Sequence, residues 1–352
     1  MLNTPSLVDQ PAPLHHGGRL RAAAAHFAIP MENWLDLSTG INPNGWPVKT
    51  PPAATWAQLP DDDDELNATA CRYYGADSLL SVAGSQAAIQ ALPQLRTPSR
   101  VSVLSPGYAE HAYAWKRNNH KVATVTPDQI DAVLPDTDVL IITHPNNPTG
   151  AVFPVAQLLN WHMKLAKRNG WLIVDEAFMD VTPEFSIASQ TSKPGLVVLR
   201  SLGKFFGLAG ARVGFVCAHP ELLTALKNLL GPWSVNAPAR WMAIQALQDT
   251  HWHNKARQHL LNESNRLKTL LTQYQLIPTG GCALFQWGHS RHATSLYEKF
   301  AYQGILVRLF NNPSSLRFGL PGNNLDWQRL DSALAVCRTA GLLDCWTQLI
   351  GT

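Results

Sequence analysis

Short apolar runs rich in β-branched residues recur through the middle of the chain, and the spacing between them leaves room for helices. They occupy residues 101–104, 139–143, 171–174, 196–201 and 213–217. A helical stretch from Pro154 to Asn169 lies between the second and third runs and ends at Gly170. A strand, a crossover helix and a second strand are the pattern of a largely parallel sheet with helices on both faces. We therefore predict an α/β fold.

The two ends of the chain are less periodic. Residues 1–50 are rich in Pro, Gly and His and predict an arm or loop, whereas 236–275 predict one or two long helices and 276–352 a short α+β segment. The aspartates at 61–64 are expected to cap the following helix, with a solvated turn as the alternative. We divide the chain into an N-terminal arm that joins a small domain (1–48), a large domain (49–250) and a small C-terminal domain (251–352).

Composition excludes several classes of protein. The chain has 352 residues, 45% of them hydrophobic and 15% charged, which indicates a globular protein with a sizeable core. A net charge of +3 leaves no large basic surface for nucleic acid. The five cysteines form no C-x-x-C pair, so we expect free thiols in a reducing compartment. Neither a signal peptide nor a membrane span is recognisable, and we expect a cytoplasmic protein without a membrane partner.

Polar residues follow three of the predicted strands at their carboxyl ends. The segment HPNNPTG follows the strand at 139–143, Asp175 and Glu176 follow 171–174, and Ser201 to Lys204 close 196–201. Ligands of open α/β sheets bind outside the carboxyl ends of parallel strands. An amide, a carboxylate, a hydroxyl and an amine are thus expected at one edge of the sheet.

Two further features suit an anion but have ordinary alternatives. Gly84, Ser85 and Gln86 open a helical segment at 85–92, where free N–H groups could hold a phosphate. Ser85 could equally be a plain N-cap. Arg212 stands among small residues as a fixed cation, or else forms an exposed salt bridge.

These segments together resemble one known family. HPNNPTG at 144–150, DEAF at 175–178 and SLGKFFGLAGARVG at 201–214 are similar, in order and spacing, to motifs of the fold-type-I pyridoxal 5′-phosphate (PLP) enzymes of the aminotransferase class I/II group. The resemblance runs from about residue 35 to about residue 330. It implies an aspartate aminotransferase-like fold with a large, mostly parallel sheet domain and a small α+β domain. It also implies PLP as the cofactor and a homodimer.

The resemblance assigns roles around the cofactor by position. Lys204 would hold PLP as a Schiff base, Asp175 would pair with the pyridine nitrogen and keep the ring an electron sink, and Asn147 would bind the phenolate oxygen. Tyr108 matches the aromatic residue that stacks on the ring and completes the expected catalytic set with Lys204 and Asp175; a core tyrosine is its alternative. The expected phosphate ligands are Gly84, Ser85, Gln86, Ser201 and Arg212.

The resemblance also implies a substrate site. Arg317 matches the arginine that binds the substrate's α-carboxylate, which a planar guanidinium recognises with two parallel hydrogen bonds. Arg308 is expected at a substrate phosphate, helped by His16 and by the segment around Gly40. A solvent-exposed loop residue is the alternative for His16. Asn147 would also contact the substrate.

The sequence departs from the family pattern at two places. Phe178 replaces the tyrosine of a DEAY motif, so one hydrogen bond to the cofactor's phenolate oxygen is lost. Leu59 replaces the tyrosine that reaches the neighbouring subunit's cofactor phosphate, although Tyr73 and Tyr74 lie nearby in sequence.

Softer cues narrow the expected reaction. The segments at 16–19, 37–43 and 304–308 resemble those of enzymes that decarboxylate O-phospho-L-threonine to (R)-1-amino-2-propanol O-2-phosphate for cobalamin biosynthesis. A histidinol-phosphate-type aminotransferase is the alternative, and a catalytically silent binding module is disfavoured by intact Lys204, Asp175 and Asn147. No metal is predicted, since His251 and His253 are two apart and no H-E-x-x-H motif exists.

Overall fold

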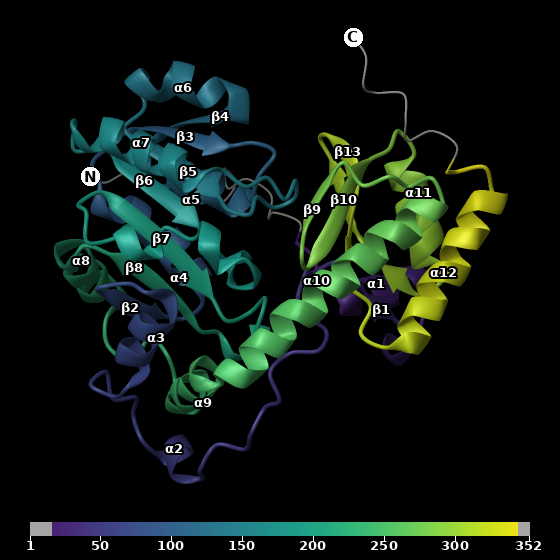
Figure 1. Cartoon of the computed structure of the whole chain (residues 1–352), viewed down its shortest axis with the longest axis horizontal. Coiled ribbons are helices and arrows are strands. Elements are labelled where there is room, and N and C mark those ends of the chain that lie inside the picture. The colour runs from purple at the N-terminus through teal and green to yellow at the C-terminus, as the bar shows by residue number, and fades with distance from the viewer. Residues whose placement is uncertain (1–15, 344–352) are drawn as a thin grey trace, which may run out of the picture.

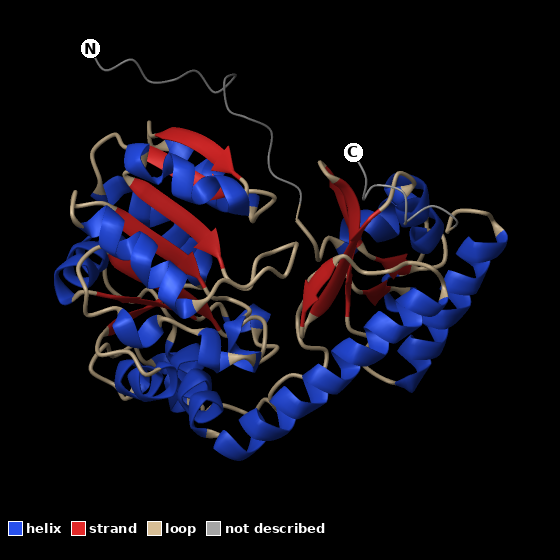
Figure 2. Ribbon diagram, turned by 45° about the horizontal axis from the view of Figure 1, so that its top comes forward, coloured by secondary structure: helices blue, strands red, loops and turns tan. Residues whose placement is uncertain are grey.

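The computed structural model describes residues 16–343 and contains one large sheet and two small ones. In Figure 1 the large sheet and its helices lie on the left, the small sheets lie on the right, and helix α10 (Thr250–Gln273) runs from one part to the other. Figure 2 shows the same two parts with their strands in red. The fold is thus an α/β assembly with a smaller α+β lobe, as predicted.

The large sheet has seven strands in the order β2-β8-β7-β6-β5-β3-β4. All five predicted strands are present, and two more, β2 and β4, lie at the two edges. The run predicted at 213–217 pairs antiparallel with both of its neighbours, whereas β3 to β7 are parallel. The strands are β2 (Leu79–Val82), β3 (Arg100–Leu104), β4 (Lys121–Val125), β5 (Val139–Thr143), β6 (Trp171–Asp175), β7 (Leu196–Ser201) and β8 (Gly214–Ala218).

Helices cover both faces of this sheet because successive strand residues point to opposite sides. Ile141 belongs to the buried cluster that includes α4, α5 and α8, whereas Leu140 and Ile142 belong to the one that includes α3, α7 and α9. The predicted helix at 154–169 is α7, and 236–275 forms two helices. The helices of this part are α2 (Ala54–Ala57), α3 (Leu66–Tyr74), α4 (Ser85–Ala91), α5 (Ala109–Arg117), α6 (Ile130–Val133), α7 (Val155–Ala166), α8 (Pro220–Leu230) and α9 (Ala237–Gln248).

The N-terminal arm is more structured than its composition predicts. Helix α1 (Leu20–Phe27) precedes β1 (Leu35–Asp36), which pairs parallel with β11 (Ile305–Leu306). Gly319 N donates to Leu37 O at 2.7 Å, so the arm also joins the last strand of the larger small sheet. Residues 20–37 are therefore part of the small lobe.

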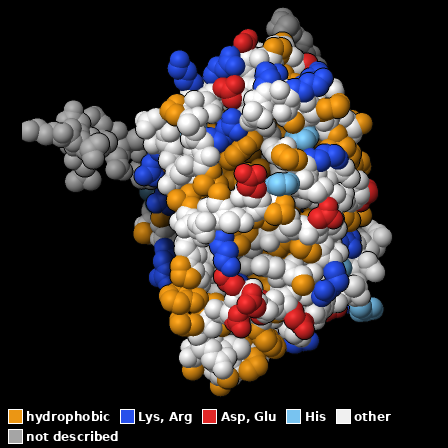
Figure 3. All heavy atoms as spheres, turned by 90° about the vertical axis from the view of Figure 1, so that its left-hand side faces the viewer, with side chains coloured by type: hydrophobic (Ala, Val, Ile, Leu, Met, Phe, Trp, Pro, Cys, Tyr) orange, Lys and Arg blue, Asp and Glu red, His pale blue; other side chains and the backbone are white. Residues whose placement is uncertain are grey.

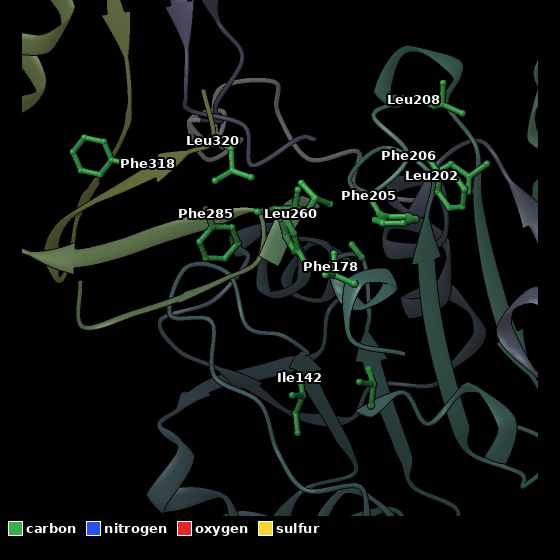
Figure 4. Packing of buried hydrophobic residues seen from close by; sticks show 14 of the residues in the cluster. Ile142, Phe178, Leu202, Phe205, Phe206, Leu208, Leu260, Phe285, Phe318 and Leu320 are labelled. Atoms are coloured by element: carbon green, nitrogen blue, oxygen red, sulfur yellow. The ribbon is translucent and has the colours of Figure 1, made fainter. Parts of the chain in front are cut away.

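The other small sheet has four antiparallel strands in the order β12-β13-β10-β9. The long helix α10 packs on β10 and supplies buried Leu260, Leu267 and Leu271 to the core. The remaining elements are β9 (Gly280–Cys282), β10 (Phe285–His289), α11 (Ala293–Ala301), β12 (Arg308–Asn311), β13 (Ser314–Gly319) and α12 (Asn324–Thr339). Figure 4 shows how residues from both parts, among them Phe178, Phe205, Leu260 and Phe285, form one apolar core at their junction.

The aspartate run has a different main role from the one expected. Asp64 does accept a hydrogen bond from Leu66 N at the start of α3. Its carboxylate oxygens, however, also bind the guanidinium of buried Arg240 at 2.6 and 2.7 Å, and Asp62 lies 3.5 Å from the same group. Burying the arginine requires these partners, so the run chiefly neutralises a buried cation and ties α3 to α9.

The distribution of charged side chains on the surface is consistent with the small net charge of +3. On the face shown in Figure 3, Lys and Arg side chains are scattered among Asp and Glu and form no continuous basic stripe.

Across residues 16–343, no helix is long and apolar enough to cross a membrane, and no three His, Cys, Asp or Glu side chains are grouped as a metal site. Within those residues Cys71, Cys217, Cys282 and Cys337 are free thiols; Cys345 lies outside them.

Two backbone segments meet where the large sheet contacts the small lobe. Gly281 N donates to Thr149 O at 3.0 Å, which joins β9 to the loop after β5. A Cβ atom on Gly150, whose φ is +74°, would lie 1.9 Å from Gly281 O, and one on Gly280 would lie 2.1 Å from Thr149 O. Only glycine allows this approach, so these residues set how the small lobe sits on the large sheet.

We predict that Gly150→Ala lowers the free energy of unfolding by about 1–3 kcal/mol, because the methyl group meets a carbonyl and φ is positive. Urea unfolding followed by circular dichroism measures the change. Gly210→Ala is the matched control, since a Cβ there has no neighbour within 4 Å. Equal stability of the two variants would contradict the requirement for glycine at the contact between Gly150 and Gly281.

Candidate active site

A cavity of about 440 Å³ lies at the carboxyl ends of the parallel strands, between the large sheet and the small lobe. A cavity of about 620 Å³ lies at the opposite ends of β6 and β7, but its lining is mostly apolar, and it contains none of the predicted site residues. The predicted residues that line the first cavity are His16, Tyr108, Asn147, Lys204, Arg308 and Arg317. The candidate site therefore lies at the edge of the sheet where the polar residues after the strands were expected.

Lys204 lies in the turn that follows β7 and is partly buried at the cavity wall. Its Nζ donates to Thr39 O at 3.1 Å and lies 5.2 Å from the centroid of the Phe178 ring. Burial, with the nearby Arg317 charge as the next cause, lowers the pKa of Lys204 to about 8. A substantial fraction of this amine is therefore neutral near pH 7–8, the form that attacks a carbonyl.

Asp175 ends β6 and is buried together with its partner. Its Oδ2 lies 2.9 Å from Nε2 of His111, and its Oδ1 accepts from Ala177 N at 3.1 Å. His111, on α5, was not among the predicted site residues. The signal available in the sequence was its position three residues after Tyr108: Tyr108 is the N-cap residue of α5, His111 lies in the first turn, and their ring centroids are 6.0 Å apart.

Arg317 connects three parts of the chain. Its Nη1 donates to Asn147 Oδ1 at 2.5 Å and its Nη2 to Ser38 O at 2.6 Å, while the guanidinium lies 4.9 Å from the centroid of the Phe285 ring. Burial, followed by repulsion from Arg308, lowers the pKa of Arg317 to about 10. Across residues 16–343 no carboxylate forms an ion pair with it, so the group is a buried cation at the cavity wall.

The predicted anion cradle is formed around the start of α4. Gly84 is the N-cap residue, so Ser85 is the first helical residue and the N-cap alternative for it is wrong. A Cβ on Gly84 would lie 2.5 Å from Arg212 Nη2, which places the guanidinium directly over the cap. Within residues 16–343 Arg212 has no salt bridge, contrary to its alternative; its Nη1 donates to Ala209 O.

Ser201 and Tyr108 border the same cradle. Ser201 pairs with Gly214 across the sheet, and a Cβ on Gly214 would lie 2.5 Å from Ser85 N. The Tyr108 hydroxyl donates to Gln86 Oε1 at 3.2 Å, and the side chain lines the cavity rather than filling the core. Burial, with Glu110 as the next cause, raises the pKa of Tyr108, so the hydroxyl stays protonated.

Of the remaining predicted substrate residues, His16 and Arg308 line the cavity and Gly40 does not. His16 Nε2 is 2.6 Å from Glu110 Oε1, a residue that was not predicted. Gly40, with φ +61°, does not line the cavity; a Cβ there would lie 3.3 Å from the rings of Phe178 and Phe285. Gly40 therefore lets the backbone pass close to the two rings, between Thr39 and Ile41, which do line the cavity.

Tyr73 and Tyr74, the tyrosines near Leu59 in sequence, both pack within their own chain. Leu59 is exposed. Tyr74 packs in the core, and the Tyr73 hydroxyl accepts a hydrogen bond from Arg257 Nη2. Both tyrosines are thus engaged within their own chain.

The sheet order, the smaller lobe built from both chain ends and the lysine at their junction define the fold of the fold-type-I PLP-dependent transferases. The family model for aminotransferase class I and II matches residues 34–334, and the chain belongs to this family.

Similar proteins agree with this placement. The chain is 52% identical over 323 residues to a threonine-phosphate decarboxylase of Pseudomonas aeruginosa, covering 91% of this chain and 97% of that protein. It is 37% identical over 332 residues to one from Sinorhizobium sp, covering 92% and 98%. A histidinol-phosphate aminotransferase from Sinorhizobium meliloti, solved in complex with pyridoxal-5′-phosphate, superposes with a TM-score of 0.82 at 18% identity over 97% of this chain and 99% of that one, which shows the common fold.

Proposed function

We propose that this protein is a PLP-dependent decarboxylase that converts O-phospho-L-threonine to (R)-1-amino-2-propanol O-2-phosphate and CO₂, for cobalamin biosynthesis. The observation that carries the proposal is a single cavity in which Lys204 lies with two arginines from the small lobe, Arg317 and Arg308. Such a cavity suits an amino acid with a carboxylate and a second anionic group. The 52% and 37% identical relatives, both threonine-phosphate decarboxylases, favour the same substrate.

The residues present fit PLP. The cradle at Gly84, where a Cβ would meet the Arg212 guanidinium, leaves backbone N–H groups of Ser85 and Gln86 for a phosphate, with Ser201 beside them. The Asp175 carboxylate is buried and oriented by His111, as a partner for a protonated ring nitrogen must be. When bound through Lys204, PLP supplies an electron sink for the pair of electrons released at the substrate's Cα.

Asn147 and Phe178 complete the proposed cofactor site. Asn147 Oδ1 accepts from Arg317, which leaves the amide N–H groups to donate to the cofactor's phenolate oxygen. Phe178 has no hydroxyl to add a second hydrogen bond there. Tyr108 lines the same cavity and is the aromatic side chain that would stack on the face of the cofactor ring.

The chain's own residues account for the rest of the reaction. Arg317 binds the substrate carboxylate and orients the bond that breaks, while Arg308, with His16, binds the phosphate. CO₂ leaves with the loss of the Cα–carboxylate bond, and a proton takes its place on the same carbon. Lys204 is the proposed proton donor, because a pKa of about 8 lets it hold or release a proton near neutral pH. The phosphate-bearing carbon is untouched and keeps its configuration.

We predict that the purified, PLP-loaded protein releases CO₂ from O-phospho-L-threonine with no 2-oxo acid present. Trapping of labelled CO₂ and detection of the amino alcohol phosphate measure the reaction. Strict dependence on 2-oxoglutarate, with formation of glutamate, would instead establish the aminotransferase alternative.

We predict that Arg317→Lys lowers kcat/KM for decarboxylation by about 10- to 100-fold, because an ammonium cannot replace a guanidinium that binds Asn147, Ser38 and a carboxylate together. Steady-state CO₂ release measures the effect. Arg338→Lys, on the exposed side of α12, is the matched control and should retain the wild-type rate. Wild-type kinetics for Arg317→Lys would remove this residue from the substrate site.

We also propose that the protein is a homodimer in the cytoplasm. Val48, Trp56 and Leu59 lie within 12 residues of each other in the chain and are 65%, 72% and 68% exposed, as large apolar side chains at a subunit interface would be in an isolated chain. Sedimentation equilibrium should give twice the chain mass of 38.7 kDa, and a monomer at micromolar concentration would contradict the proposal. Cell fractionation tests the location, where a reducing environment keeps the thiols free.

A further inference from the structure

Glu110 is a buried carboxylate beside the cavity that the proposed reaction does not use. It lies in the first turn of α5, with its side chain 12% exposed. Its Oε1 is 2.6 Å from His16 Nε2, and its Oε2 accepts from Gln86 Nε2 at 2.7 Å and from Gln90 Nε2 at 3.0 Å. A carboxylate removed from water needs such donors. These come from two elements, so Glu110 ties the N-terminal segment and α4 to α5.

Both ends of the Gln86 amide are hydrogen-bonded, and Glu110 determines which way the amide is turned. An ionised carboxylate only accepts hydrogen bonds, so the NH₂ end of Gln86 must face Glu110. The amide oxygen then faces Tyr108, whose hydroxyl donates to it at 3.2 Å. Since Tyr108 lines the cavity, Glu110 orients a side chain of the site through one intermediate residue.

His16 is held in the same way on the other side of the carboxylate. Gly18 N donates to Ser38 Oγ at 2.8 Å, and a Cβ on Gly17 would lie 2.5 Å from Ser38 O, the carbonyl that binds Arg317. The backbone next to His16 is therefore packed against the residue that anchors Arg317. Glu110 then fixes the ring itself.

The place where His16 is held suits an anion. His16 and Arg308 both line the reaction cavity and also a neighbouring cavity of about 550 Å³. With Nε2 directed at Glu110, the other ring nitrogen remains to interact with a ligand, and in the protonated ring it donates to a phosphate oxygen.

We infer that Glu110 is a positioning residue that acts in two ways, which are the first arm and the second arm of the proposal. Its carboxylate holds His16 beside Arg308, where the imidazole contributes to binding a phosphate, and holds the Gln86 amide that orients Tyr108. The first arm rests on the proposed function, because it requires a phosphorylated substrate. The second arm concerns the cofactor site alone.

The first arm is tested by binding, measured by calorimetry on the PLP-loaded protein. The probes are O-phosphoethanolamine and ethanolamine. The dissociation constant of ethanolamine divided by that of O-phosphoethanolamine reports the phosphate's contribution. We expect His16→Gln and Glu110→Gln each to lower this ratio about tenfold, the effect of one hydrogen bond to a charged group. The double variant should lose no more than the larger single loss, because both residues act through one contact.

Three results would overturn the first arm: an unchanged ratio in Glu110→Gln, an additive loss in the double variant, or an equal loss in Glu221→Gln. Glu221 is the matched control, a carboxylate exposed on α8 outside the cavity. In steady-state assays the expected change in Glu110→Gln is a raised KM with kcat near wild type. A fall in kcat at unchanged KM would contradict positioning of the phosphate end.

The second arm is read from the cofactor's visible circular dichroism. Glu110→Gln keeps an oxygen for the Gln86 and Gln90 amides, so its spectrum should match wild type, whereas Glu110→Ala should change it. Identical spectra for both variants would overturn this arm, provided far-ultraviolet dichroism shows both folded. If wild type releases no CO₂ but Glu110→Gln still lowers the phosphate preference, the proposed reaction fails and this inference stands; if wild type decarboxylates and the preference is unchanged, only this inference fails.

Discussion

The Arg317 guanidinium is buried with no carboxylate partner among residues 16–343, and this is the constraint around which the site is organised. Removing a cation from water is costly unless polar groups replace the solvent. The amide oxygen of Asn147 and the carbonyl of Ser38 do so, and they come from the loop after β5 and from the N-terminal arm. Burial, followed by repulsion from Arg308, still lowers the pKa of Arg317, so its cationic form is less favoured here than in water. The substrate carboxylate that we propose for this site would supply the missing charge.

This constraint explains why both ends of the chain are needed. Ser38 is brought to Arg317 by the pairing of β1 with β11 and by the bond from Gly319 N to Leu37 O. Asn147 is brought there by the close backbone contact between Thr149 and Gly281. A substrate carboxylate on Arg317 would thus contact a residue to which the arm, the large sheet and the small lobe are all bound.

The near-neutral charge of the chain conceals how unevenly its cations are used. Arg240 is buried and neutralised by the aspartate run, so it stabilises the fold. Arg212 lies over the start of α4 without a salt bridge in the described chain, and Arg317 is buried at the cavity wall. Such positions differ in solvation, which a net charge of +3 does not reveal.

The local sequence was sufficient to predict the parallel strands and the residues at their carboxyl ends, because strand period and motif order are local properties. Lys204, Asp175 and Asn147 could be predicted for that reason. It did not determine the antiparallel β8, the helix in the arm or the partners of the aspartates. His111 meets Asp175 across 64 residues and His16 meets Glu110 across 94, and only the tertiary structure decided these pairs. A buried carboxylate must find a donor, but the local sequence does not say which distant segment supplies it.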